Sequence, residues 1–80
     1  MVATELQHFP IVVEQDEDGV FIVSCPTLRG CHSYGKTIDE ALVNIREVIE
    51  LCFEDAAAAA PVNTFVGIRD LEIALPAKIA

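Results

Sequence analysis

The stretch that decides the fold is residues 9–25, which read FPIVVEQDEDGVFIVSC. Within it, two runs rich in β-branched and aromatic residues, 9–14 and 20–25, flank a polar segment that ends in Asp18-Gly19. Such side chains favour strands, and an Asp-Gly pair favours a turn because glycine tolerates a positive φ. The pattern therefore predicts a β-hairpin.

A third strand and the start of a helix follow the hairpin. Pro26 ends the second strand, since proline has no N–H to donate to a ladder, and residues 31–34 read as a short third strand closed by Gly35. Thr37 is a good N-cap, and Glu40 three residues later completes a capping box. A helix is therefore predicted from Thr37 onward.

The predicted helix presents one apolar stripe, because its apolar residues recur at intervals of three and four. The members of the stripe are Ile38, Ala41, Leu42, Ile45, Val48, Ile49, Cys52, Phe53 and Ala56. Val43 and Leu51 fall outside it, on the otherwise polar side. The alanine run 56–60 predicts a helix that continues to about residue 58, before Pro61 stops it, with a low-complexity linker as the alternative.

A final strand completes the predicted fold. Residues 71–75 alternate large apolar with smaller or polar side chains, and residues 64–68 are left open as an extension. The order is β-β-β-α-β, and a right-handed crossover places the last strand parallel to a neighbour. We expect an α+β fold with a four-stranded sheet of spatial order 3-2-1-4 and one helix on one face. At 8.7 kDa the chain has room for one domain, 1–80, with its core at about 8–75.

Both faces of the central strands are apolar. Residues 11–13 and 20–23 are continuous apolar runs, whereas a sheet with one solvated face alternates apolar and polar side chains. One helix covers only one face, so we expect self-association, as a dimer or higher, or a permanent partner. The alternative is that residues 1–7 or 62–68 fold across the second face. The candidate interface residues are Val12, Phe21, Val23, Val43 and Leu51.

The charge indicates a basic partner. Thirteen acidic residues against five basic ones give a net charge of −8 and a pI of about 4.4. Such a chain repels DNA and anionic membranes and attracts basic proteins, although acidity alone also serves solubility. The candidate partner-binding carboxylates are Asp16, Glu17 and Asp18 in the hairpin turn and Glu47, Glu50 and Glu54 on the helix. We expect no direct DNA binding.

Cysteine usage and the N-terminus indicate a cytoplasmic protein. The three cysteines are an odd number, which argues against a disulfide framework. No apolar run approaches the roughly 18–20 residues that span a bilayer, and no basic cluster precedes an apolar core, as it would in a signal peptide. We therefore expect a reducing compartment and no membrane association.

The residues capable of chemistry form no recognisable catalytic or metal pattern. The possible zinc ligands are Cys25, Cys31, His32 and Cys52, which lack a CxxC knuckle. Neighbours on a strand point to opposite faces, so Cys31 and His32 diverge rather than pair. The segment Asp16-x-Asp18-Gly19 resembles part of a calcium loop but lacks the later bidentate glutamate. We expect no enzymatic activity, no cofactor and no metal; the enzyme alternative is a degenerate nuclease or metal-dependent hydrolase that uses Glu14, Asp16 and Asp18.

The motifs downstream of the hairpin resemble those of a known family. They are Pro26-Thr27-Leu28-Arg29-Gly30-Cys31, then Ser33, Gly35 and Thr37, then Glu40-Ala41-Leu42, Asn44-Ile45 and Glu47. Together with the hairpin, over about residues 9–54, they resemble the HicB antitoxin family of bacterial and archaeal toxin–antitoxin systems. The sequence departs from the family pattern at Thr27 and Lys36, where aspartate is usual, and at Arg29, where proline is usual.

The resemblance implies a partial ribonuclease-H-like domain without the catalytic carboxylates of ribonuclease H, in agreement with the element order predicted above. It also implies a protein that neutralises a small basic RNA-cleaving toxin, HicA, by covering it. Many members carry a C-terminal DNA-binding segment, which we expect to be absent because the chain stops after one strand. The remaining alternative is a solitary oligomeric domain that binds another ligand.

Overall fold

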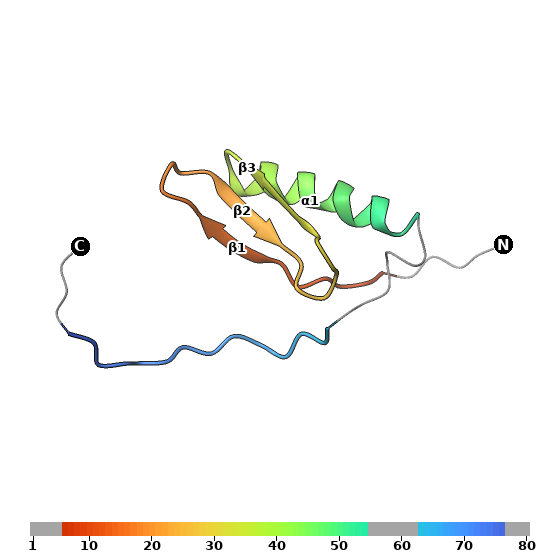
Figure 1. The fold of residues 1–80 in the computed structure, drawn as a ribbon. Coiled ribbons are helices and arrows are strands. Elements are labelled where there is room, and N and C mark those ends of the chain that lie inside the picture. Colours follow the sequence, from red (N-terminus) through yellow and green to blue (C-terminus); the bar gives the residue numbers. More distant parts are fainter. Residues whose placement is uncertain (1–5, 55–62, 77–80) are drawn as a thin grey trace.

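A three-stranded antiparallel sheet and one helix make up the body of the protein (Figure 1). The computed structural model describes residues 6–54 and 63–76. Its elements are β1 (Val12–Gln15), β2 (Phe21–Ser24), β3 (His32–Gly35) and α1 (Ile38–Cys52), and the strand order is β1-β2-β3. The predicted α+β class, the hairpin, the third strand and the helix are therefore confirmed.

The hairpin turn sets the register of β1 and β2. The Gly19 N–H donates to the Asp16 carbonyl at 3.0 Å, and the Asp16 N–H donates to the Val20 carbonyl at 2.9 Å. Gln15 consequently pairs with Phe21, with a five-residue connection between the two strands. Because residues directly opposite in an antiparallel ladder share a face, odd-numbered residues of the two strands lie on one side and even-numbered residues on the other.

The odd-numbered side faces the helix. Val13 pairs with Val23, and Val23 is fully buried in the core, with Phe21 packed against the same core. Val23, one of the expected interface residues, therefore has no exposed surface in this structure, and Phe21 is half-buried on the side of the sheet that α1 covers. The opposite side carries Val12 and Ile22, so only Val12 of the three sheet candidates points away from the helix.

The core lies between the sheet, α1 and the loop after β2. Its buried members are Val23, Cys25, Leu28, Cys31, Ala41 and Ile45. The loop folds back on itself because the Cys25 N–H donates to the Cys31 carbonyl at 2.9 Å and the Leu28 N–H to the Cys25 carbonyl at 3.2 Å. Burial of an aliphatic side chain such as Leu28 contributes about 1.5–3 kcal/mol to folding. The Pro26–Cys31 motif thus supplies core side chains.

The helix begins where the capping box predicts. Thr37 Oγ1 accepts a hydrogen bond from the Glu40 N–H at 3.0 Å. The Glu40 carboxylate reaches back to the Lys36 N–H at 3.1 Å, one residue earlier than in the usual box. Further along α1, Asn44 Nδ2 donates a hydrogen bond to the Tyr34 carbonyl at 2.8 Å, which links α1 to β3.

The helix ends earlier than its alanine run predicts. It stops at Cys52, where the Phe53 N–H donates to the Ile49 carbonyl at 3.2 Å and the Phe53 ring packs edge-on against Phe9, with ring centroids 5.7 Å apart. The last turn has no basic residue, and carboxylates at a helix C-terminus oppose the helix dipole. The predicted continuation is therefore wrong at residues 53–54, and the run 56–60 lies outside the described residues.

Residues 63–76, named here the 63–76 arm, form an extended segment outside the sheet (Figure 1). All of its side chains are exposed, and Asn63 Nδ2 donates to the Pro26 carbonyl at 3.4 Å. Among the described residues the sheet has three strands, so the structure differs from the predicted four-stranded order 3-2-1-4. Residues 71–75 are extended, as the alternation predicts, but pair with none of the three described strands. Nor do residues 63–68 pack across the second face of the sheet, since they too are exposed.

Candidate partner-binding surface

The acidic hairpin turn uses one of its three carboxylates to hold its own backbone. Asp16 Oδ1 accepts hydrogen bonds from the N–H groups of Asp18 and Val20, both at 2.9 Å. The side chains of Glu17 and Asp18 are exposed. A substitution of Asp16 would therefore alter the turn as well as the charge, whereas Glu17 and Asp18 can change charge alone.

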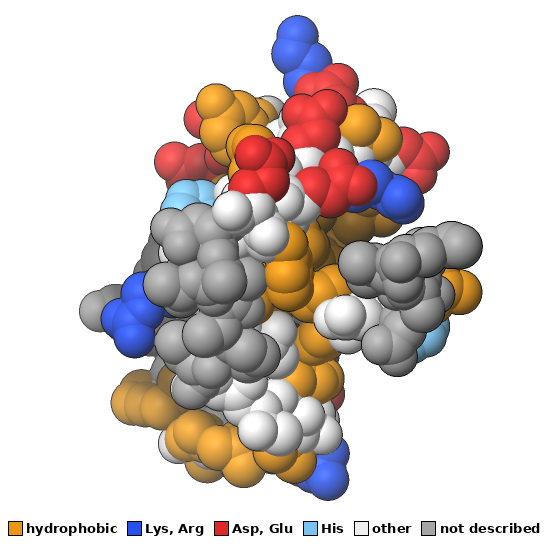
Figure 2. All heavy atoms as spheres, turned by 90° about the vertical axis from the view of Figure 1, so that its right-hand side faces the viewer, with side chains coloured by type: hydrophobic (Ala, Val, Ile, Leu, Met, Phe, Trp, Pro, Cys, Tyr) orange, Lys and Arg blue, Asp and Glu red, His pale blue; other side chains and the backbone are white. Residues whose placement is uncertain are grey.

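The three helix carboxylates follow one line along α1 and the turn after it. Glu47, Glu50 and Glu54 are spaced by three and four residues, which places them above one another on a helix surface, and all three are exposed. They lie opposite the buried residues Ala41 and Ile45. Figure 2 shows acidic side chains gathered at the helix side of the molecule, above an exposed apolar strip.

Two exposed apolar residues share this side of the helix. Val43 is 56% exposed and Leu51 is 62% exposed, and each lies four residues from Glu47. We call the set Val43, Glu47, Glu50, Leu51 and Glu54 the outer helix face. The structure thus brings together candidates that the sequence had assigned to two separate roles, partner binding and self-association.

The hairpin carboxylates are not part of this face. The hairpin turn adjoins the end of β3, because Phe21 pairs with Gly35, and α1 begins just after that point. Glu54 lies at the other end of α1, next to the contact between Phe53 and Phe9. A 15-residue helix is about 22 Å long, so the two acidic clusters are separated by roughly the length of the helix.

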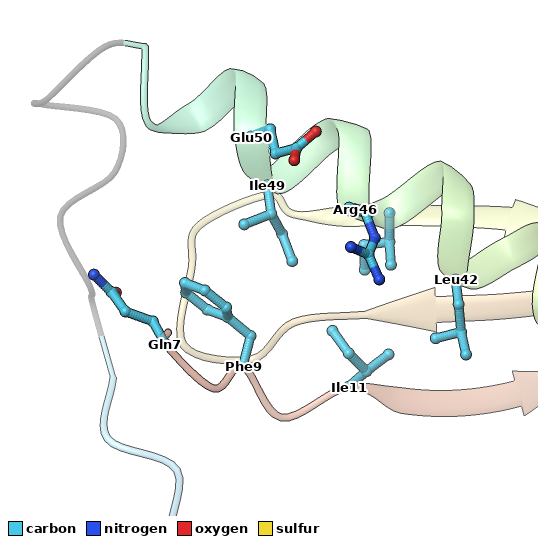
Figure 3. Close-up of a pocket in the computed structure, with 8 residues that line it drawn as sticks. Gln7, Phe9, Ile11, Leu42, Arg46, Ile49 and Glu50 are labelled. Atoms are coloured by element: carbon cyan, nitrogen blue, oxygen red, sulfur yellow. The ribbon is translucent and has the colours of Figure 1, made fainter. Parts of the chain in front are cut away.

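A groove of about 330 Å³ opens between α1 and the chain leading into β1. Its apolar lining consists of Phe9, Ile11, Leu42, Ile45 and Ile49. Arg46 and Glu50 add one charge of each sign, and Figure 3 shows Phe9 and Ile11 reaching toward α1 while Ile49 reaches down from it. The groove exists because α1 packs over β2 and β3 and leaves the inner side of β1 open, where Val13 is 43% exposed.

The second face of the sheet is partly apolar. Val12, Ile22 and Tyr34 lie on it, as the register requires, and Tyr34 is 66% exposed. The sequence interpretation named Val12 here but missed Ile22 and Tyr34. The length of the hairpin connection could have indicated that Ile22 lies on this face, since that length determines which residues of β2 share a face with Val12.

The cysteines and His32 do not form a catalytic pair. Cys25 and Cys31 are buried and His32 is exposed on the neighbouring position of β3. Burial, helped by the nearby Cys25 and Cys52 sulfurs, raises the pKa of the Cys31 thiol to about 11. At neutral pH this thiol is protonated, and a protonated thiol is a poor nucleophile. Cys25 Sγ lies 3.4 Å from Thr27 Oγ1, a contact internal to the loop.

We expect Cys52 to react first with a chromogenic disulfide reagent at pH 8, because it is half-buried while Cys25 and Cys31 are in the core. One thiol should react quickly, and the other two only as the protein unfolds. The matched control is Cys52→Ser, which should remove the fast phase. Fast labelling of Cys31, located by peptide mass spectrometry, would contradict this.

The carboxylates proposed for the nuclease alternative do not converge on a metal site. Asp16 is engaged in the turn, and Glu14 lies on the sheet face opposite the helix. In the part of the chain that the structure describes, no group of three or more His, Cys, Asp or Glu side chains is placed to hold a metal ion. Within residues 6–54 and 63–76, no helix combines the length and the apolar character required to cross a membrane.

The described residues define a small α+β domain whose prominent surface features are the outer helix face and the apolar groove. Comparison with known families matches residues 9–72 to the HicB-like antitoxin of bacterial toxin–antitoxin systems. The match covers most of the chain, and the chain belongs to this HicB-like antitoxin family. Family membership supports an antitoxin role, which implies a toxin as binding partner.

Relatives occur in bacteria and archaea, and two of the three described next match over nearly their whole length. A UPF0150 protein of Synechocystis is 45% identical over 67 residues, which cover 84% of this chain and 96% of the relative. A UPF0150 protein of Archaeoglobus fulgidus is 38% identical over 65 residues, 81% of this chain and 93% of the relative. One from Helicobacter pylori is 51% identical over 47 residues, 59% of this chain and 64% of the relative. No solved structure matches the chain.

Proposed function

We propose that this protein is a non-catalytic antitoxin that sequesters a small basic, HicA-like RNA-cleaving toxin through its outer helix face. The observation that carries the proposal is the composition of that face. Exposed Val43 and Leu51 lie among Glu47, Glu50 and Glu54 on one side of α1. Apolar side chains supply the burial that a stable complex needs, and the carboxylates select a basic partner.

Electrostatics favours this pairing. An RNA-cleaving toxin must carry positive charge to bind phosphates, and a chain of net charge −8 attracts such a surface over several ångströms. Steered association is fast at low salt and weakens as salt rises. The same charge disfavours binding of this protein to DNA on its own, and we propose no cofactor and no metal for its function.

We also propose that the protein self-associates and that a fourth strand, residues 71–75, lies beside β1. The sheet would then have the order 3-2-1-4 of a partial ribonuclease-H-like fold. Supporting this, β1 has a hydrogen-bonded neighbour on one side only, and the apolar residues of the 63–76 arm are exposed. Val12 on the second sheet face is the remaining sheet candidate for contact between copies.

Charge reversal of the outer helix face is expected to abolish toxin capture. The variant Glu47→Lys/Glu50→Lys/Glu54→Lys should lose at least about tenfold in affinity for a small basic HicA-like toxin, because like charges would then face each other. The measurement is co-expression, affinity capture in 150 mM salt and a titration by calorimetry. Rescue of growth in the co-expressing strain is the functional readout.

The matched control is Glu17→Lys/Asp18→Lys, which also reverses exposed carboxylates but at the far end of α1. It should retain capture. If the control loses capture and the helix variant keeps it, the toxin contacts the hairpin turn and not the outer helix face. If the unaltered protein does not bind the toxin at all, the antitoxin proposal is wrong and a domain that binds another ligand takes its place.

A further inference from the structure

The outer edge of β1 lacks a neighbouring strand in the described structure. The sheet order is β1-β2-β3, so one row of β1 backbone N–H and C=O groups faces away from β2. Proteins rarely leave such an edge open, because it pairs readily with any extended chain. Beside this edge lies the apolar groove lined by Phe9, Ile11 and Ile49. A strand added to β1 would therefore meet both unpaired backbone groups and unfilled apolar surface.

The 63–76 arm has the chemistry of that missing strand. Leu71, Ile73 and Leu75 alternate with Glu72 and Ala74, so one face of the extended arm is apolar and the other is not. These three apolar side chains are 82%, 67% and 75% exposed. Exposed alternate apolar residues on an extended backbone need a surface to cover them.

In the structure the extended arm does not place residues 71–75 on the β1 edge of its own chain. It is held at Asn63, beside Pro26, which lies at the end of the sheet where β1 begins. Leu71 is eight residues further on, about 26 Å along an extended chain, whereas the four residues of β1 span about 13 Å. Figure 1 accordingly shows the arm running on past the hairpin turn, beyond the end of the sheet.

We propose that residues 71–75 of one copy pair with the β1 edge of a second copy, in a reciprocal exchange. Leu71, Ile73 and Leu75 enter the groove of that copy, and the backbone of the arm satisfies the open edge of β1. A two-fold axis makes the two contacts identical and closes the assembly as a dimer. A stable interface buries roughly 1,000 Å² or more in total, and the exposed Leu71, Ile73 and Leu75 side chains of two arms would contribute to that area. This inference rests on the self-association proposed above and is independent of the toxin.

The test combines mass and contact measurements on the full chain. Light scattering at micromolar concentration should give twice 8.7 kDa. Chains labelled with ¹³C and unlabelled chains, unfolded together and refolded, should give isotope-filtered NOEs between arm methyl groups of one chain and Ile11 or Ile49 of the other. Ile73→Asp should return the mass to 8.7 kDa. Glu72→Ala, on the opposite face of the same segment, is the matched control and should leave the dimer intact.

Each other outcome overturns the exchange in a different way. Arm contacts found only within a chain would mean that the arm is the fourth strand of its own sheet. A dimer without filtered arm contacts would leave the self-association in place but assign it to other surfaces, such as Val12 or Leu51. If the protein is a monomer, both the arm exchange and the self-association are wrong. Capture of the toxin by that monomer would still support the antitoxin function. Because the arm lies outside the core, circular dichroism should show Ile73→Asp to be folded.

Discussion

Gly35→Ala is expected to destabilise the protein by about 2–3 kcal/mol, a large part of the total stability of an 80-residue domain. A Cβ at position 35 would lie 2.6 Å from the backbone nitrogen of Ala41 and 3.0 Å from its Cα. These are backbone atoms of α1, so no side chain can rotate away. The helix would have to move off β3, and the hydrogen bond from Asn44 to the Tyr34 carbonyl would lengthen.

Urea unfolding followed by circular dichroism measures this change. The matched control is Gly30→Ala, where a Cβ meets nothing within 4 Å but φ is +66°. A left-handed φ costs a non-glycine residue about 1 kcal/mol, so the control should be the milder variant. Equal losses for the two variants would show that close approach between β3 and α1 is not what requires glycine at position 35.

Ile45→Ala is expected to destabilise the protein by about 2–5 kcal/mol, a large fraction of the total stability of a small domain. Ile45 is 2% exposed and is among the largest fully buried side chains of the core. Removing its side-chain atoms loses both their transfer free energy and their contacts with the surrounding residues. The free energy of unfolding is again read from the urea midpoint.

Leu51→Ala is the matched control for Ile45→Ala, on the same helix but 62% exposed. It should change the free energy of unfolding by less than about 0.5 kcal/mol. A large loss that grows with protein concentration would mean that Leu51 is covered by a second copy, as the sequence interpretation expected. Such a result would also remove Leu51 from the proposed toxin surface.

Local chemistry made the body of the fold predictable. Thr37 and Glu40 define the helix start through hydrogen bonds between neighbouring residues, and the structure contains both bonds with a shift of one residue in the second. The apolar stripe predicted the burial of Ala41 and Ile45, since a 3.6-residue period fixes which positions share a face. These signals depend on residues a few positions apart, and no distant contact needs to be known.

The face of the sheet was predicted less well because it depends on the register. A two-residue connection at Asp18-Gly19 would pair Glu17 with Val20 and place Val12 on the same face as Phe21 and Val23. The observed connection is longer, and it shifts the pairing by one residue. A one-residue shift exchanges the two faces of a strand, which is why Val23 is in the core and Ile22 lies beside Val12.

The sequence by itself determined the order of the first three strands and the helix, the helix start, the net negative charge and the family resemblance, because each depends on residue type and short spacing. Only the tertiary structure decided which side of the hairpin α1 covers, where α1 ends and where the 63–76 arm goes. Helix propensity of alanine is worth a few tenths of a kcal/mol per residue, and packing contacts such as that of Phe53 on Phe9 compete with it directly. For residues 71–75, alternation defines a strand but not its partner, because edge pairing depends on which backbone lies within reach.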